Sequence, residues 1–154
     1  MTDHREHFID AISNAATITG DLDTAQESAK LYGDIQDDLD MLLDPDEEPS
    51  LAFLSVVPVG HRNHFAISAL LEDRLIVGWA SGVFRKKFGS LVVPYSTITA
   101  VDAQAASSDP SLGRNPVITI KGEQTTTVAI PPQGSPLAAA VRDAIVDKAG
   151  LSHA

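Results

Sequence analysis

The chain has 154 residues, a formal net charge of −10, a hydrophobic content of 44% and no cysteine. This length suits one domain, with or without an appendage. The lack of cysteine excludes disulfides, thiolate catalysis and cysteine-based metal sites. The longest apolar run, Leu51 to Val59, is far shorter than the ~20 residues that span a bilayer. The N-terminal segment has no apolar signal core, so we expect a cytoplasmic protein.

The negative charge is concentrated in the first third of the chain. Residues 1–50 carry fourteen Asp and Glu against two Lys and Arg, whereas residues 51–154 carry seven acidic and nine basic residues. The first segment therefore has a net charge of −12 and the remainder a net charge of +2. Long-range repulsion by this excess argues against nucleic acid as a partner.

Two amphipathic helices are predicted before any strand. Residues 3–19 repeat apolar positions at spacings of three and four and stop at Gly20, and residues 22–43 carry one apolar stripe along their length. Aspartates at 34, 37, 38 and 40 crowd the end of the second helix, where negative charge opposes the helix dipole. We therefore expect this helix to need a partner surface, on its own β domain or on another subunit. Its acidic face is either a solvated surface or an electrostatic clamp on a basic partner.

A linker with two prolines and four acids, residues 44–50, leads into a run of predicted strands. Val83 to Phe88, followed by Gly89 and Ser90, has the composition of a basic-tipped hairpin. A last helix is predicted over 137–148, with Ser135 as its N-cap and Pro136 in its first turn. Strands are expected at 51–57, 64–71, 74–80, 91–94, 97–103, 116–121 and 125–130.

The central stretch LLEDRLIVGWASGVFRKKFGSLVVPYSTITAVD resembles the bacterial pleckstrin-homology-like domains. Their motif joins a tight turn ending in Arg-Leu to a P-Y-x-x-I-x-x-V segment. Here these positions fall on Glu72, Asp73, Arg74 and Leu75, and then on Pro94, Tyr95, Ile98 and Val101. Leu71-Glu72-Asp73 stands where family members often carry Thr-Asp.

The resemblance covers about residues 50–150 and implies a fold that is mainly β with α. We expect a seven-stranded, antiparallel, partly open barrel over residues 50–154, capped by the C-terminal helix. Two acidic helices and a linker precede it, and these residues, 1–49, are called the acidic arm below. Arg74, Trp79 and Tyr95 are expected to be structural: Arg74 bonded to backbone carbonyls or an acid, and both aromatics in the core or at its rim.

Pleckstrin-homology-like domains include phosphoinositide binders, peptide binders and assembly domains. Lipid-binding members place several cations in the loop between the first two strands, where this chain offers only Arg62. Arg85, Lys86 and Lys87 form the strongest basic cluster. It is a turn that keeps a sheet edge soluble, a surface that pairs with the acidic helices, or an anion site, favoured in that order.

No motif for catalysis, a cofactor or a metal is present. The sequence has no glycine-rich phosphate loop and no nucleophile elbow. His61 and His64 lack a third ligand, and prolines 45 and 49 break the resemblance of the acidic linker to a calcium loop. We therefore expect a non-catalytic module, without a cofactor, that mediates protein contact or self-association through its acidic helices and sheet edges. The alternative is an anionic lipid or membrane-surface module that uses Arg62 and the basic cluster 85–87.

Overall fold

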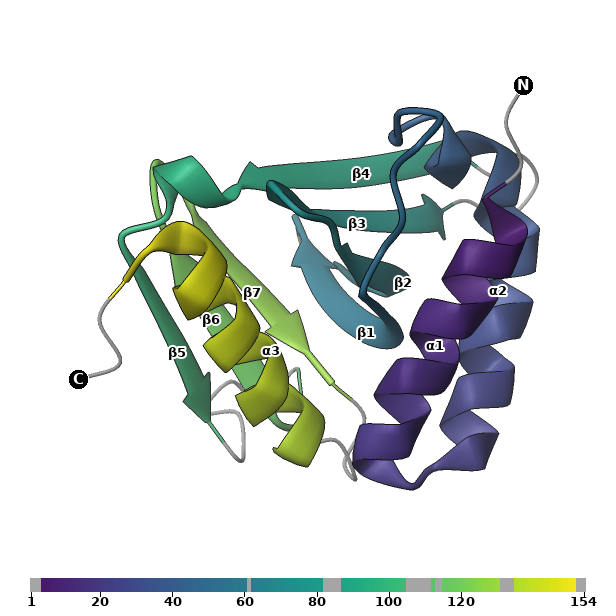
Figure 1. Ribbon diagram of the computed structural model, residues 1–154, viewed down its shortest axis with the longest axis horizontal. Helices are drawn as coiled ribbons and strands as arrows, with labels where there is room; N and C mark the ends of the chain where they lie inside the picture. Colours follow the sequence, from purple (N-terminus) through teal and green to yellow (C-terminus); the bar gives the residue numbers. More distant parts are fainter. Residues whose placement is uncertain are drawn as a thin grey trace.

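The computed structural model describes residues 4–60, 62–81, 87–104, 112, 115–130 and 135–151. Within them, two helices precede seven strands and one helix follows, which confirms the expected fold class (Figure 1). The helices are α1 (Arg5–Thr19), α2 (Leu22–Asp40) and α3 (Ser135–Ala149). The strands are β1 (Leu51–Val59), β2 (Arg62–Leu70), β3 (Arg74–Ser81), β4 (Lys87–Pro94), β5 (Ala100–Gln104), β6 (Val117–Lys121) and β7 (Thr125–Ala129), with a 3₁₀ turn η1 (Tyr95–Thr97) between β4 and β5.

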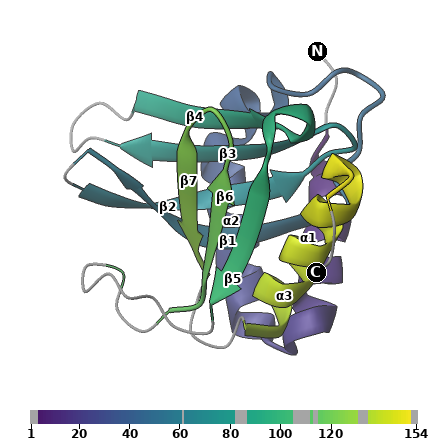
Figure 2. The same cartoon turned by 90° about the vertical axis from the view of Figure 1, so that its left-hand side faces the viewer.

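The strands form one antiparallel sheet in the order β4-β3-β2-β1-β7-β6-β5. Its two halves, β1–β4 and β5–β7, cross each other and enclose the core (Figure 2). β1 pairs with β7 only at Val56–Ala129, so the first half of β1 has no strand partner on that side. This unpaired part of the barrel is called the seam below. β4 and β5 remain as unpaired edges, and the barrel is therefore partly open.

The barrel interior is apolar and is closed by α3. Inward-facing side chains of both halves of the sheet pack against α3 and against Ala15 of α1. α3 lies along β5–β7 (Figure 1). The largest contributors from the strands are Phe53, Leu70, Leu75, Val77, Trp79, Ile118, Ile120 and Val128, and those from α3 are Leu137, Val141 and Ile145.

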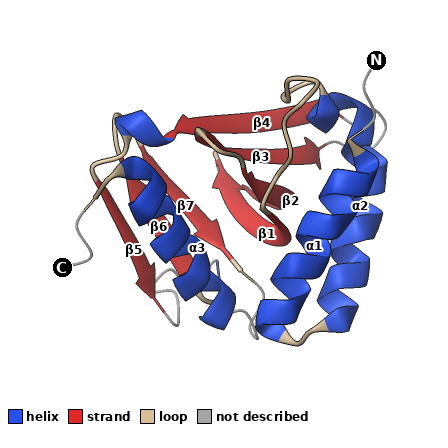
Figure 3. Cartoon of the chain, in the orientation of Figure 1, coloured by secondary structure: helices blue, strands red, loops and turns tan. Residues whose placement is uncertain are grey.

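A second core lies on the outer face of the sheet, under α1 and α2. The two helices run side by side beside β1–β3 (Figure 3). Tyr32, Ile35 and Leu39 of α2 are buried there, and the ring of Phe8 stacks on Tyr32 with centroids 4.4 Å apart. The stripe of α2 therefore packs on its own sheet. The strand residues of this core are Ala52, Ile67, Ala69, Leu71 and Ile76.

β1, β2 and β3 are covered by side chains on both faces, which explains why their sequences are nearly continuous apolar runs. A strand with one solvated face alternates apolar and polar residues, whereas a strand covered on both faces does not. The apolar runs of these strands therefore match a sheet covered by α1 and α2, and the partner surface expected for the second helix is its own β domain rather than another subunit.

The hairpin predicted around residues 83–90 is wrong at its second half. β4 continues through Gly89 and Ser90 to Pro94. Gly89 pairs with Trp79, and a Cβ at Gly89 would lie 2.5 Å from the indole ring. This glycine is needed for close approach rather than for a turn. Residues 83–86 lie outside the described part of the chain. The predicted ends also shift: α2 stops at Asp40 and β5 begins only at Ala100.

Candidate functional site

The two basic candidates that the structure describes lie at one end of the barrel. Arg62 begins β2 opposite Val59, and Lys87 begins β4 opposite Ser81. Both side chains are exposed. Strand alternation puts each on the side of its strand that faces the barrel interior, since Lys87 shares its face with Gly89. Arg85 and Lys86 lie outside the described residues.

Trp79 and His64 close the core beneath these cations. Trp79 is 7% exposed, and its ring stacks with that of His64 at a centroid distance of 6.3 Å and an interplanar angle of 15°. The indole is therefore part of the core, as expected. His61, the other histidine considered for a metal pair, lies outside the described residues. The described part of the chain contains no group of three or more His, Asp or Glu placed to hold a metal ion.

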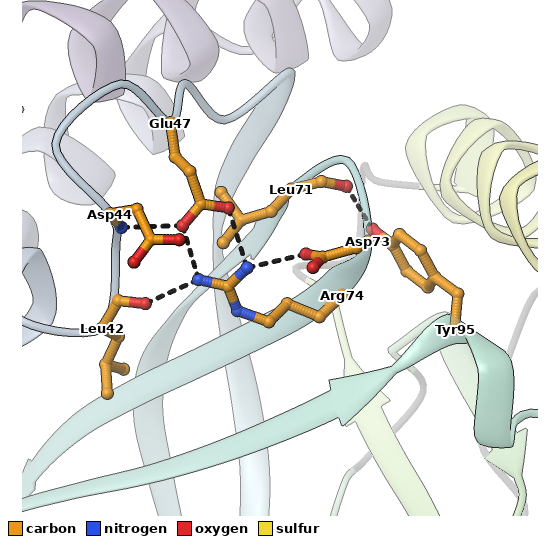
Figure 4. A network of polar contacts seen from close by, with 7 residues as sticks. All are labelled: Leu42, Asp44, Glu47, Leu71, Asp73, Arg74 and Tyr95. Atoms are coloured by element: carbon orange, nitrogen blue, oxygen red, sulfur yellow. Dashed lines mark hydrogen bonds and ion pairs between the residues drawn. The ribbon is translucent and has the colours of Figure 1, made fainter.

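Arg74 ties the acidic arm to the start of β3 (Figure 4). Its guanidinium donates from Nη1 to Glu47 Oε2 at 2.8 Å and from Nη2 to Glu47 Oε1 at 2.7 Å, a bidentate pair. Nη2 also donates to the backbone oxygen of Leu42 at 2.8 Å, and Nη1 to Asp73 at 2.6 Å. The prediction that Arg74 is structural, bonded to backbone carbonyls or to an acid, is confirmed, and the structure shows both kinds of contact.

The two acids that bind Arg74 differ in solvent exposure. The Arg74 and Glu47 side chains are 16% and 20% exposed, whereas Asp73 is 72% exposed. Hydrogen bonds from Arg74 hold the pKa of Glu47 below its ordinary value, and the amide of Asp44 adds a further bond at 2.7 Å. Glu47 in turn raises the pKa of Arg74. The network is thus a fixed joint between the linker and the sheet.

Tyr95 completes the same corner from the other side of the β2–β3 turn. Its hydroxyl donates to the backbone oxygen of Leu71 at 2.8 Å, and burial raises the pKa of the phenol. Tyr95 is 2% exposed, so it is a core residue as expected.

Asp40 is separated from the other aspartates at the end of α2 because it is buried. It is 7% exposed and accepts a hydrogen bond from the Tyr32 hydroxyl at 2.8 Å. The backbone amide of His4 points to its other oxygen at 3.4 Å, which joins the start of α1 to the end of α2. Asp34, Asp37 and Asp38 are exposed. None of the ion pairs found among the described residues involves these three.

Two polar contacts join the helices to β1 where β7 does not pair with it, and no sequence motif predicted either of them. Ser28 of α2, 2% exposed, accepts from the Leu54 amide at 3.0 Å and donates to the Thr24 oxygen at 2.8 Å. Asn14 of α1 donates to the Ser50 oxygen at 3.3 Å. α1 and α2 thus supply partners to a strand edge that β7 leaves open. A cavity of about 20 Å³, lined by both helices, β1 and Leu137, lies in this seam.

Comparison with known proteins shows the fold. No family model matches the sequence, and no curated protein matches it. A DUF1696 family protein with a pleckstrin-homology domain from Shewanella loihica matches with a TM-score of 0.51 at 18% identity, over 77% of this chain and 92% of that one.

Two further solved structures give similar superpositions. The hSac2 domain of the human phosphoinositide phosphatase Sac2 has a TM-score of 0.53 at 12% identity, covering 79% of this chain and 82% of that one. The linker-DH/PH domains of p115-RhoGEF have a TM-score of 0.51 at 9% identity, over 94% of this chain and 41% of that longer chain. The predicted pleckstrin-homology-like fold is confirmed. None of the described helices is long and apolar enough to cross a bilayer.

Proposed function

We propose that this pleckstrin-homology-like chain is a non-catalytic binding module that contacts a basic protein partner through its acidic arm. The observation that carries the proposal is the way the arm is held. Its apolar stripe packs on its own sheet, and the carboxylates of Asp34, Asp37 and Asp38 are exposed on the outside of this fixed layer.

The arm is anchored at three places, which makes its outer face a preformed surface. Arg74 and Glu47 hold the linker, the buried Asp40 holds the helix ends together, and Ser28 joins α2 to β1. A preformed surface loses little conformational entropy on binding. The charge of −12 in residues 1–50 would speed the encounter with a basic partner and make it sensitive to salt.

The perturbed titratable groups support a non-catalytic function. Glu47, Arg74 and Tyr95 bond to the protein's own groups in the corner between linker and sheet. The lowered pKa of Asp21 has an equally local cause, because its carboxylate caps α2 by accepting from Thr24. Among the described residues, the groups with shifted pKa values therefore serve structural contacts and do not point to a catalytic acid, base or nucleophile.

The test compares charge removal on the arm with equal charge removal on the barrel, in the full chain. The arm variant is Asp34→Asn, Asp37→Asn, Asp38→Asn. The matched control neutralises three exposed barrel acids: Glu72→Gln, Asp102→Asn and Glu123→Gln.

Proteins captured by the unmodified chain are purified and titrated against all three forms. We expect a complex that the arm variant weakens and the control retains. Equal affinity of arm variant and control would contradict the proposal. Light scattering on the same samples shows whether the partner is a second copy of the chain.

A second candidate function, binding to an anionic surface, is favoured by one observation. Arg62 and Lys87 lie at one barrel end on inward-facing strand positions, and Lys87 belongs to the basic cluster of the sequence. Sedimentation with phosphatidylserine vesicles tests it. Loss of binding in Arg62→Ala with Lys87→Ala would support this function, and unchanged binding by that variant would reject it.

A further inference from the structure

A row of apolar side chains crosses the outer face of the sheet beside α2. Val56 of β1 pairs with Phe65 of β2, and Ala80 of β3 pairs with Phe88 of β4. Phe65 and Ala80 follow in register from the pair Ala66–Trp79, so the four residues form one line across four strands. Phe65 is 66% exposed and the other three are half-buried. Phe65 is thus the solvent-exposed member of a contiguous apolar row, and contiguous exposed apolar surface is what marks an interaction site.

α2 lies parallel to this row, two residues away along each strand. Its Ser28 bonds the Leu54 amide, and its Leu39 side chain lies 2.8 Å from where a Cβ of Gly78 would be. Leu54, Ile67 and Gly78 are themselves paired across β1–β3. Two residues of strand separate the helix from the apolar row, a distance of about 7 Å. The row therefore borders α2 on the outer face of the sheet, with Phe88 packed against the core under the helix and Phe65 open to solvent. The row and the side of α2 next to it are called the groove below.

The side of α2 that faces this groove is acidic. Gln36 and Asp40 face α1, because they bond Arg5 and the amide of His4 respectively. With 100° of rotation per residue, the opposite side of α2 carries Glu27, Leu31, Asp34 and Asp38. Leu31 packs against the outer core, and the three acids are exposed.

We propose that this groove binds a basic, amphipathic helical segment of the protein partner. The groove is defined by the row Val56, Phe65, Ala80 and Phe88 and by the acidic wall Glu27, Asp34 and Asp38. An apolar floor with a carboxylate wall complements a helix with one apolar stripe flanked by Lys or Arg. Phe65 is the anchor at its centre, since aromatic side chains dominate binding energy in such contacts. This inference rests on the proposed function and assigns its partner class.

The probe is a synthetic peptide of about 18 residues, five helical turns, with leucine at helical spacing and lysine elsewhere. Two control peptides have the same composition in scrambled order and glutamate in place of lysine. Binding to the full chain is followed by fluorescence anisotropy of the labelled peptide.

The protein variants separate the floor from the wall. We expect Phe65→Ser to weaken binding about tenfold or more and Phe65→Leu to restore part of it. Asp34→Asn with Asp38→Asn should weaken binding about two- to fivefold and reduce its salt dependence. Val92→Ser is the matched control, because Val92 is a 46% exposed apolar residue of β4 and is not in the row. It should bind as the unmodified chain does.

The other possible results would contradict the groove, the acidic contact surface or both. Unchanged binding by Phe65→Ser, or equal binding of the scrambled peptide, would overturn the groove. If the aspartate variant alone lost binding, the acidic arm would still be the contact surface and only the groove would fail. If no variant changed binding, both proposals would fail. A dimer of the unmodified chain that Phe65→Ser dissociates would assign the groove to a second copy and overturn the proposal.

Discussion

Replacing Arg74 by alanine tests whether the contact between linker and sheet stabilises the whole fold. The change removes both hydrogen bonds to Glu47 and the bond to the Leu42 oxygen. Hydrogen bonds to charged groups contribute about 1.5–3 kcal/mol each, and removing one partner of a buried ion pair costs about 3–5 kcal/mol. The Arg74 and Glu47 side chains are 16% and 20% exposed, so water compensates in part. We therefore expect a loss of about 2–3 kcal/mol in the free energy of unfolding.

Urea unfolding followed by tryptophan fluorescence measures this loss directly. Trp79 is the only tryptophan of the chain and is buried, so its emission reports on the barrel core. A double-mutant cycle with Glu47→Ala isolates the pair, and its coupling energy should be about 1.5–2.5 kcal/mol. Asp73→Ala is the control: Asp73 is 72% exposed and bonds the same guanidinium, and its removal should cost less than about 0.5 kcal/mol.

Two results would refute this reasoning. One is an Arg74→Ala protein within about 0.5 kcal/mol of the unmodified chain, which is the range of ordinary surface substitutions. The other is additivity of the Arg74 and Glu47 changes within about 0.3–0.5 kcal/mol, which would mean that the two side chains do not stabilise each other.

Four further substitutions test separate features of the structure. The folded-state pKa of Glu47 is lowered, so the stability that its charge contributes is present above the unfolded pKa of about 4.3 and is lost as pH falls through the folded value. Glu47→Gln should therefore unfold at lower urea concentration than the unmodified chain at neutral pH, and the two should converge in acid. A difference that stays constant with pH would contradict this. Gly89→Ala should cost about 1–3 kcal/mol through overlap with Trp79, while Gly33→Ala, with open space around it, should gain about 0.5–1 kcal/mol; equal thermal midpoints would be evidence against both. Ser28→Ala should cost about 1–3 kcal/mol by leaving a buried β1 amide unpaired, and faster hydrogen exchange at that amide would locate the effect.

The secondary structure was largely predictable because its signals are local. Helical spacing and Gly20 marked α1, and Ser135 with Pro136 marked the start of α3. The error at Gly89 shows the limit of such signals. A glycine in a strand marks a turn or a close approach, and the choice depends on the side chain opposite, here an indole on another strand.

The candidate site was less predictable, since it depends on which segments meet. The resemblance pointed to the basic cluster, of which the structure describes Lys87 alone. The exposed Phe65 and the acidic wall of α2 were not singled out, because their adjacency follows from strand register and from the side of α2 that faces α1. The placement of Arg74 as a structural residue was predictable from its position after a tight turn, but the identity of its acid was not.

The sequence by itself determined the order of elements, the barrel class and the division of charge along the chain. Periodicity, capping residues and composition are properties of neighbouring residues, and they suffice for these features. Only the tertiary structure decided where the acidic arm lies, that Glu47 is the acid that binds Arg74, and that Asp40 is buried while its neighbours on α2 are not. The reason is that burial and pairing depend on distances between segments far apart in the chain. An apolar stripe predicts that α2 packs on some surface, and the structure shows that this surface is its own sheet.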